Sequence, residues 1–485
     1  MRPCRMKKSS KVSIVISPQN TKQPKRIFMK FKDITLETTN KVLSSNSGLV
    51  LFQKLWEDLK IEQKIKRVIP RKRRNKGAMQ WNKVKSLLLS FALGNDSLSD
   101  LDILRNDELF MTFTAGGVSS RSMGDFLRSF NKRKIELLQT LLVELSIKLR
   151  LLLTEDKDFI LTMDSTPHEH YSEKMEGMAY NYKNYYCLDS QNAYDQYGLS
   201  YLFDLRPGNT FSGDESELWI HKIFSKIPED MNRYFRADSA YSKHVVFKAL
   251  EAANAKFTIV LKDNIGRYVR KKNKNLLSWR KTNLYFFDSS ECEVAMGLYP
   301  IKQFGTFRVV FIRAPKKDYT PTLFDGDYEE ERYQHYSIIT NISSFDMDEE
   351  AVINFYRKRA NAENFIKEQK YGYDFLNFPC LKLDANRVYG LIGTLSYNLM
   401  RFLSFCMDQK VKRVRGKDKK VRTVTQQGYF SKHIRNHLIK IPCQVVKHAR
   451  TMSLKLNQQT REVLEKVICK IQNSSSKVCY IQVQT

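Results

Sequence analysis

Closely spaced cysteines are missing from this sequence. Its eight cysteines are scattered over 485 residues and include no Cys-x-x-Cys pair. Because structural zinc sites need clustered Cys and His ligands, zinc has little support. His168 and His170 lie near each other but have no further clustered partners, so we expect them to be loop residues rather than ligands. The cysteines themselves are expected to be reduced thiols.

Long apolar runs are missing as well. No segment offers about 18 uninterrupted apolar residues, the length that a membrane-spanning helix needs. Even the stretch 391–407 is interrupted by Arg401. The basic segment 1–30 lacks the compact apolar core of a secretory signal. We therefore expect a cytoplasmic protein that does not enter a membrane.

Acidic residues are scarce relative to basic ones. The chain has 82 Lys and Arg against 52 Asp and Glu, a net charge of +30. Solubility does not require so large a charge, and a polyanionic partner, above all nucleic acid, explains it better. Three dense basic runs, at 67–76, 267–274 and 410–422, are the expected phosphate contacts, although solvated loops would have the same composition.

The chain is long enough for one large elaborated fold or for two to four domains. Its composition changes along its length, from a Lys/Ser-rich start through helical periodicity to alternating apolar strands. We expect a basic mobile arm (1–47), a helical domain (48–150), a core in two parts (151–264 and 335–408) separated by a β-rich insertion (265–334), and a basic helical C-terminal region (409–485).

The stretch from Tyr356 to Lys370 predicts a helix with an unusual face. Four acidic residues between 346 and 350 favour a helix start, no Gly or Pro occurs from 351 to 369, and Gly372 favours a stop. A solvated face is the ordinary explanation for mixed charges on a helix. Here the helical period brings four side chains within about 60° of one another, namely Tyr356, Arg359, Glu363 and Lys370.

Two aspartates strengthen the case for a site. Asp164 follows the apolar run 159–163, and Asp238 follows the run 234–237, so each is expected where a strand ends. Ligands bind at the carboxyl ends of strands in α/β sheets. Two strand-borne Asp and the helix-borne Glu363 form an oxygen ligand set that suits two hard cations such as Mg²⁺.

These motifs resemble the DDE transposases of bacterial insertion sequences that carry the YREK signature. The signature residues are Tyr356, Arg359, Glu363 and Lys370, and the aspartates stand in Asp164-Ser165-Thr166 and Asp238-Ser239-Ala240-Tyr241. The run Leu205-Arg206-Pro207-Gly208-Asn209, between the aspartates, is a further similar feature. The resemblance implies an α/β fold, a ribonuclease H-like mixed sheet with a β-rich insertion, flanked by helical N-terminal and C-terminal regions.

The resemblance also implies a mechanism. Asp164, Asp238 and Glu363 would be catalytic and would hold two Mg²⁺, with Mn²⁺ as an expected substitute, for in-line displacement at phosphorus. Tyr356, Arg359 and Lys370 would hold DNA phosphates beside the scissile bond. The partners would be double-stranded DNA, as terminal inverted repeats and as target, bound by a homodimer in the bacterial nucleoid. A direct hydrolytic route and a hairpin route both fit these residues.

Trp279 is a further candidate for DNA contact. It lies in the expected insertion next to Arg280. Such a tryptophan would stack on an unpaired base, a contact of about 1 to 3 kcal/mol. Equally, it would serve to cap a hydrophobic cluster.

Two alternative functions remain open. A general ribonuclease H-like nuclease would share the carboxylates but would not need the large basic N-terminal domain or the insertion. A non-catalytic, element-derived DNA-binding repressor would share the charge but would not need three acids. The presence of all three favours an enzyme, a metal-dependent DDE transposase that cuts and joins DNA strands.

Overall fold

The computed structural model describes residues 34–72, 77–317, 319, 331–409, 411–415, 421–425 and 428–481. The chain divides into a segment Met1–Lys41 and a large unit Val42–Thr485. Residues 34–41 are exposed and form no helix or strand, and the rest of the expected arm lies outside the described residues. Leu43–Ser44 falls within the expected arm but forms a short strand β1 that pairs with β14 (Cys443–His448) in the large unit.

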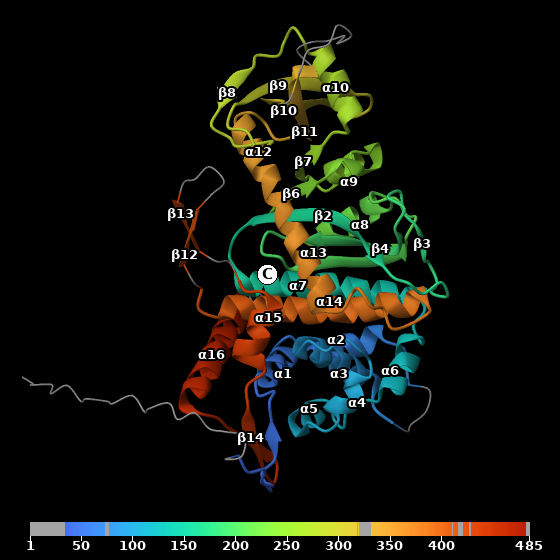
Figure 1. Cartoon of the computed structure of the whole chain (residues 1–485), viewed down its shortest axis with the longest axis vertical. Helices are drawn as coiled ribbons and strands as arrows, with labels where there is room; N and C mark the ends of the chain where they lie inside the picture. Colours follow the sequence, from blue (N-terminus) through green and yellow to red (C-terminus); the bar gives the residue numbers. More distant parts are fainter. Residues whose placement is uncertain are drawn as a thin grey trace, which may run out of the picture. The chain divides into compact units, whose positions relative to one another are not determined.

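Helices make up the region from 48 to 153, as its apolar periodicity predicts (Figure 1). The expected helix from 122 to 152 is interrupted near Asn131, because the Asn131 side chain caps a new helix by accepting a hydrogen bond from the Lys134 backbone N–H at 3.0 Å. The helices are α1 (Leu49–Asp58), α2 (Ile61–Val68), α3 (Gln80–Leu93), α4 (Asp100–Leu104), α5 (Glu108–Phe113), α6 (Ser120–Leu127) and α7 (Lys132–Leu153).

A mixed ten-stranded sheet follows, in the order β3-β4-β2-β6-β7-β11-β10-β9-β8, with β5 paired to β4. Its central strands β2, β6 and β7 are parallel, and its other pairs are antiparallel. This is the expected α/β, ribonuclease H-like type of fold with helical flanks. The strands are β2 (Asp158–Glu169), β3 (Ala179–Tyr180), β4 (Tyr186–Tyr194), β5 (Ser200–Pro207), β6 (Asn232–Ala237), β7 (Lys256–Val260), β8 (Arg280–Thr282), β9 (Cys292–Ile301), β10 (Gly305–Pro315) and β11 (Tyr333–Thr340).

The β-rich insertion extends the main sheet rather than forming a separate one. Strand β11 pairs with β7 through Ile338↔Val260, Ile339↔Ile259 and Thr340↔Thr258. The second basic run largely falls on helix α10 (Asp263–Lys272), which lies between β7 and β8 in the chain. The insertion therefore belongs to the same hydrogen-bonded sheet as the strands that carry the candidate site.

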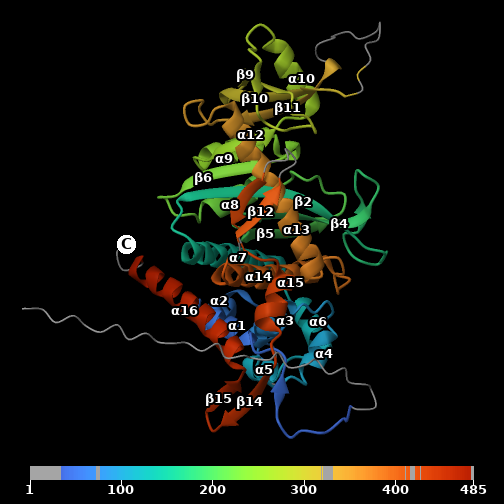
Figure 2. The same cartoon turned by 60° about the vertical axis from the view of Figure 1, so that its left-hand side comes forward.

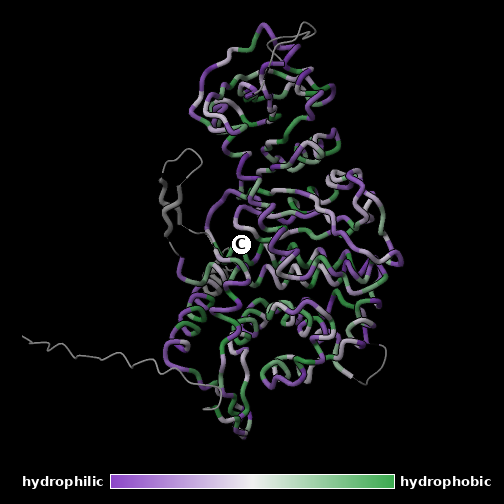
Figure 3. Tube along the Cα trace, in the orientation of Figure 1, coloured by the Kyte–Doolittle hydropathy of each residue, from purple (hydrophilic) through white to green (hydrophobic). Residues whose placement is uncertain are grey.

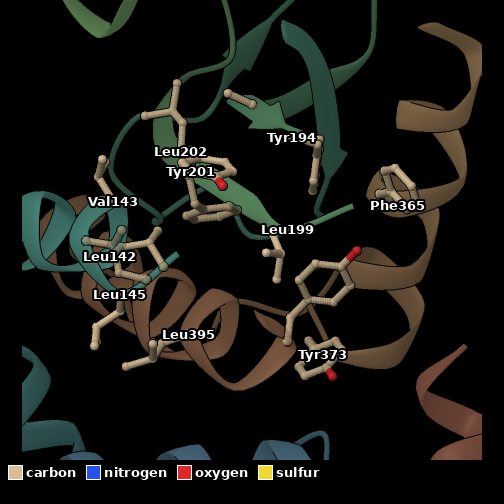
Figure 4. Close-up of a cluster of buried hydrophobic side chains, with 14 of the residues drawn as sticks. Leu142, Val143, Leu145, Tyr194, Leu199, Tyr201, Leu202, Phe365, Tyr373 and Leu395 are labelled. Atoms are coloured by element: carbon tan, nitrogen blue, oxygen red, sulfur yellow. The ribbon is translucent and has the colours of Figure 1, made fainter. Parts of the chain in front are cut away.

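The main core lies between the sheet and two long helices, α7 and α14 (Leu383–Cys406), which pack against each other and against β5. Figure 4 shows Leu142 and Leu145 of α7 facing Tyr201 of β5 and Leu395 of α14, and apolar residues recur along both helices in Figure 3. At Gly390 a Cβ would lie 2.0 Å from the Phe203 ring, so only glycine lets α14 approach β5 so closely. Across the described chain, none of the helices has the length and apolarity to cross a membrane.

The C-terminal region, expected to be helical, also contains two pairs of strands. The sequences Val-Lys-Arg-Val-Arg and Val-Arg-Thr-Val-Thr contain six β-branched residues among ten, and β-branched residues favour strands over a helix. The final helix is also longer than expected. The elements are β12 (Val411–Arg415), β13 (Val421–Thr425), α15 (Ser431–Ile434), a π-helical turn η4 (Arg435–Ile439), β14, β15 (Thr451–Lys455) and α16 (Gln458–Ile481).

Candidate active site

Asp164 and Asp238 lie at matching positions on neighbouring strands. Parallel strands β2 and β6 pair up to Thr162↔Arg236, and each aspartate comes two residues later in its own strand direction. Because strand side chains alternate between faces, the two carboxylates belong to the same face of the sheet. Strand β6 ends at Ala237, as expected, whereas β2 does not end at Asp164 but continues to Glu169 by pairing with β4.

Asp238 is held in place by the turn that follows it. Its Oδ1 accepts a hydrogen bond from the Ala240 backbone N–H at 2.9 Å and so caps the 3₁₀ turn η2 (Ser239–Tyr241). Helix α9 (His244–Ala252) then begins and returns the chain to β7. This strand, turn and helix order presents the carboxylate at the carboxyl end of a strand, where ligands bind in α/β sheets.

The helix predicted to carry the third acid is not continuous. Helix α12 (Glu349–Arg357) begins at Asp348, whose side chain accepts a hydrogen bond from the Ala351 N–H. It gives way to a 3₁₀ turn η3 (Lys358–Ala360) before helix α13 (Asn361–Gly372) begins. Figures 1 and 2 show α12 and α13 following one another along one face of the sheet.

Arg359, in the turn η3, joins the first and third acids. Its Nη1 donates to Asp164 Oδ2 at 2.9 Å, and its Nη2 lies 3.4 Å from Glu363 Oε1. Burial acts to lower the pKa of Arg359, but the charges of Tyr356, Asp164, Asp238 and Glu363 outweigh it and raise the pKa. Arg359 is therefore a permanent cation within electrostatic reach of all three acids.

The three acids differ in their surroundings. The Asp164 side chain is 15% exposed, whereas the Glu363 side chain is 63% exposed. Burial raises the pKa of Asp164 to about 6, and the negative charges of Asp238 and Glu363 add to the shift while Arg359 opposes it. A carboxylate in such a place gains from any additional cation.

Tyr356 does not share the exposed face of Glu363. It is buried on the preceding helix, where Tyr336 of β11 donates a hydrogen bond to its hydroxyl oxygen at 3.2 Å. Burial raises the pKa of Tyr356 well above its ordinary value. The predicted phosphate contact of Tyr356 would need this hydroxyl pair to open.

Lys370 lies at the other end of α13, where its Nζ donates to the backbone oxygen of Pro167. Pro167 is on β2, three residues beyond Asp164, so α13 runs along the strand that carries the first aspartate. Burial lowers the pKa of Lys370, although nearby Glu169 and Asp189 oppose this shift.

Sequence reasoning missed Arg236, a buried residue two positions before Asp238. Its Nε and Nη2 donate to Thr162 Oγ1 at 3.2 and 3.1 Å, and its Nη1 donates to the Phe355 carbonyl oxygen at 3.0 Å. Arg236 thus ties the end of α12 to both aspartate-bearing strands. Its position in the sequence could have pointed to Arg236, because residues two apart in a strand lie on the same face and Arg236 comes two residues before Asp238.

Trp279 and His168 have structural surroundings. The Trp279 ring is half-buried, packs near Phe311 and His335, and has the guanidinium carbon of Arg313 4.0 Å from its centroid. His168 is not a loop residue as expected. It is fully buried on β2 between the Phe375 carbonyl oxygen at 2.6 Å and Ser190 Oγ at 2.7 Å, and burial lowers its pKa to about 3.

The donor chemistry suits a hard cation, but the acids are not gathered around one. Within the described ranges, no three Asp, Glu, His or Cys side chains are close enough together to hold a metal ion. Instead of a metal ion, the Arg359 guanidinium lies between Asp164 and Glu363 and supplies positive charge there. Carboxylate oxygens are the ligands that hard divalent cations prefer, so the donor chemistry of the three acids suits such an ion.

Comparison with known proteins agrees with this geometry. The model of the family described as transposase DDE domain group 1 matches residues 28–476. No curated protein sequence matches the chain. The family match includes both aspartates, Glu363 and all the elements that position them. The chain therefore belongs to the transposase DDE domain group 1 family, whose members are metal-dependent enzymes that act on DNA.

Proposed function

We propose that this transposase, of the YREK type and from a bacterial insertion sequence, cuts the ends of its own element and joins them to target DNA. The observation that carries this proposal is the equal register of Asp164 and Asp238 on adjacent strands, with Glu363 joined to the same site through Arg359. Three acids in one electrostatic cluster exceed what a DNA-binding repressor needs.

Arg359 exchanges partners during the reaction. Before DNA arrives, its guanidinium neutralises Asp164 and Glu363, which would otherwise repel each other and any phosphate. A guanidinium binds phosphate in the same bidentate manner as carboxylate, so a backbone phosphate of the DNA competes for it directly. When Arg359 turns to the phosphate, the carboxylates become free to act as ligands.

When bound by Asp164, Asp238 and Glu363, two Mg²⁺, or Mn²⁺ in their place, supply activation of the attacking oxygen and stabilisation of the leaving 3′ oxygen. The protein's own groups position the strand. Arg359 in the turn η3 and Lys370 near the end of α13 hold phosphates beside the scissile bond, about three helical turns apart. Water attacks first and the released 3′-hydroxyl attacks next, either on the opposite strand or on the target strand.

The helical domain recognises the element ends. A cavity of about 780 Å³ separates the start of the first basic run from α6. Four basic residues line it, namely Arg71, Lys72, Lys83 and Arg128, and the rest of that run, 73–76, lies outside the described residues. Their charge suits contact with duplex phosphates. Two copies of the chain on two ends would form the working homodimer.

The test is cleavage of a labelled duplex taken from the DNA that borders the gene. Asp164→Ala and Asp238→Ala should each abolish Mg²⁺-dependent cleavage without unfolding the protein. Asp230→Ala is the matched control, because Asp230 precedes the same strand as Asp238 but forms only an exposed ion pair with Lys157. Near wild-type cleavage by either folded site variant would remove the metal-ligand assignment.

A further inference from the structure

An exposed aromatic ring lies beside two lysines close to Asp238. Phe211 is 43% exposed, and the Nζ atoms of Lys243 and Lys262 lie 4.5 and 5.6 Å from the centroid of its ring. An ammonium over an aromatic face is attracted to the ring, so the ring gathers the two cations around it. None of these three residues takes part in the metal chemistry of the candidate active site.

The three residues come from three loops at one edge of the sheet. Strand β5 runs in the same direction as β2, because both pair antiparallel with β4, and β6 and β7 run parallel to β2. Phe211 follows β5, Lys243 follows β6 and the turn η2, and Lys262 follows β7. They therefore gather at the carboxyl edge that also carries Asp238, where ligands bind in α/β sheets.

The loop that carries Phe211 packs directly on the turn that Asp238 caps. At Gly213, two residues after Phe211, a Cβ would lie 2.2 Å from the Ala240 backbone oxygen, so only glycine lets the loop approach so closely. The N–H of the same Ala240 donates to the Asp238 carboxylate. The loop is therefore in contact with the turn that positions a candidate catalytic acid.

Two side chains of the sheet fix the backbone of this loop just after Phe211. Gln191, on β4, donates through Nε2 to the Ser212 carbonyl oxygen at 3.0 Å. Arg206, a buried residue of β5, donates through Nη1 to the Asp214 carbonyl oxygen at 3.0 Å. The Phe211 ring is therefore held out to solvent by an anchored backbone instead of turning inward to the core.

Local stability does not explain where the two lysines lie. Lys243 and Lys262 each stand directly before a helix, α9 and α10, where positive charge is unfavourable for the helix. Lys243 pairs with Asp214 at 2.7 Å, but an ion pair as exposed as this one contributes little. A phosphate can therefore replace Asp214 as the partner of Lys243.

The ring and the two cations together fit an unpaired nucleotide of a DNA strand. Aromatic side chains stack on bases of any kind, and lysines contact the phosphates of the same strand. A base within a duplex is covered by its neighbours on both faces, so a base that stacks on protein must leave the duplex. Cutting one strand supplies such a base, because the strand end at the cut can separate from its complement.

We propose that Phe211, Lys243 and Lys262 bind an unpaired nucleotide at the cut strand end beside Asp238. The base stacks on the Phe211 ring and displaces the ammoniums, which turn to the phosphates of the strand. This inference rests on the proposed function, because strand cleavage supplies the unpaired nucleotide. The site keeps the cut end near the acids for the joining step.

The test uses the full-length protein and two labelled duplexes from the DNA that borders the gene. One has a fully paired end, and the other has an unpaired end that carries 2-aminopurine. Phe211→Leu should bind the unpaired end about 5- to 100-fold more weakly than the wild type and the paired end almost equally well. Phe211→Trp should keep this affinity. The wild type and Phe211→Trp should quench the 2-aminopurine fluorescence by stacking, and Phe211→Leu should not.

The lysines are tested by combining Lys243→Gln with Lys262→Gln. On the unpaired end, the slope of log affinity against log salt should become shallower by about 1.4, since each phosphate contact of a single strand contributes about 0.7. The aromatic variants should keep the wild-type slope, because they remove no charge.

Matched controls lie at the opposite edge of the sheet. Phe345→Leu removes a fully exposed ring after β11, which runs antiparallel to β7. Lys157→Gln combined with Lys256→Gln removes two lysines that each pair with an aspartate, where β2 and β7 begin. Both controls should bind the two duplexes like the wild type, and all variants should melt like it.

Wild-type affinity of Phe211→Leu for the unpaired end would overturn the proposal. An equal loss of affinity for both ends, or a change in oligomeric state alone, would overturn it as well. If the wild-type protein binds neither duplex, the proposed function itself is wrong. If the wild type binds and cleaves the paired duplex while Phe211→Leu matches it in every assay, only the nucleotide site is wrong.

Discussion

Arg359 is the residue through which the candidate site is held together in the absence of DNA. It contacts Asp164, 195 residues away in sequence, and Glu363, four residues away. The contact between Arg359 and Glu363 is an ordinary i,i+4 ion pair. At an exposed position such a pair would contribute less than about 1 kcal/mol to stability. The contact between Arg359 and Asp164 involves a largely buried carboxylate. Apart from Arg359, only the Ser165 backbone N–H favours the charged form of Asp164 among the main influences on its pKa.

Glu363→Gln and Arg359→Ala should separate catalysis from binding. Loss of the Glu363 charge should leave end-DNA binding unchanged or slightly tighter but slow cleavage by several orders of magnitude, because each 1.4 kcal/mol of lost transition-state stabilisation is about tenfold in rate. Arg359→Ala should weaken both, since its phosphate partner is present before and during the reaction. Gel shift and a Mg²⁺ time course on one labelled duplex measure the two effects.

Arg461 and Glu465 provide the control for these two variants. They form another i,i+4 pair with the same order of charges, at 2.7 Å, and both side chains are exposed on helix α16. Arg461→Ala and Glu465→Gln should change neither cleavage nor the protein's catalytic metal requirement. Normal cleavage by Glu363→Gln, or loss of DNA binding while it stays folded, would show that Glu363 is not the third catalytic acid.

Asp164 should make stability depend on pH. Its pKa is raised from 3.8 to about 6 in the folded protein, so the folded state holds the proton more tightly than the unfolded state. The contribution of this tighter proton binding to the stability of the fold is fully present below about pH 4 and is lost as the pH rises through about 6. Without metal or DNA, Asp164→Asn should therefore stabilise the fold at pH 7 by about 1 to 3 kcal/mol and hardly at all at pH 4.

Thermal melts in a chelator at the two pH values measure this effect. Asp230→Asn serves as the comparison, since its carboxylate is exposed and its pKa is lowered by the hydrogen bond with Lys157. It should give no stabilisation at pH 7. An equal change in melting temperature at both pH values for Asp164→Asn would contradict the raised pKa.

At the scale of elements, the interruption between α12 and α13 is what places Arg359 over the acids. A continuous helix would keep Tyr356 and Glu363 on one face, whereas the turn η3 lets Tyr356 pack in a hydrophobic cluster while Glu363 stays exposed. Arg236 holds the end of α12 against β2 and β6 just before this turn. Burial, followed by the charge of Arg359, lowers the pKa of Arg236 only to about 10, so it stays charged at neutral pH.

Thr162→Val should loosen this attachment. It removes the hydroxyl that accepts from two nitrogens of Arg236 and leaves those donors buried without a partner, at a cost of about 1 to 3 kcal/mol. The melting temperature should fall, and cleavage should slow more than DNA binding weakens, because the acids and Arg359 lose their relative positions. Melts, anisotropy binding and cleavage rates report the three effects.

Thr258→Val is the matched control on strand β7, which is separated from β2 by β6. Thr258 is equally buried, but its hydroxyl has no hydrogen-bond partner in the structure. This substitution should change stability and cleavage little. If the two variants behave alike, the bond between Thr162 and Arg236 does not position the site.

At the scale of the whole molecule, the net charge of +30 should dominate how the protein meets DNA. With contacts from several basic runs, affinity for a duplex should fall by about 10³ to 10⁵ between 50 and 200 mM salt, the range for 6 to 10 phosphate contacts. Fluorescence anisotropy across a salt series measures the slope. An affinity that hardly changes with salt would remove DNA as the main partner.

Much of this molecule follows from its sequence alone. Apolar periodicity predicts the N-terminal helices, and the apolar runs before Asp164 and Asp238 predict the two strands that carry them. The basic excess predicts a polyanionic partner. These features depend on residues within a few positions of one another, or on composition, so local propensity and charge are sufficient to indicate them.

Only the tertiary structure decides how the acids meet. The equal register of β2 and β6, the break at η3 and the contact between Arg359 and Asp164 all depend on elements that are distant in sequence. The same is true of Tyr356. Helical periodicity places Tyr356 beside Glu363, whereas in the fold Tyr356 packs against Tyr336 and is buried. Helical periodicity describes a helix in isolation, whereas the free energy of burying a particular side chain depends on the neighbours that the fold brings to it.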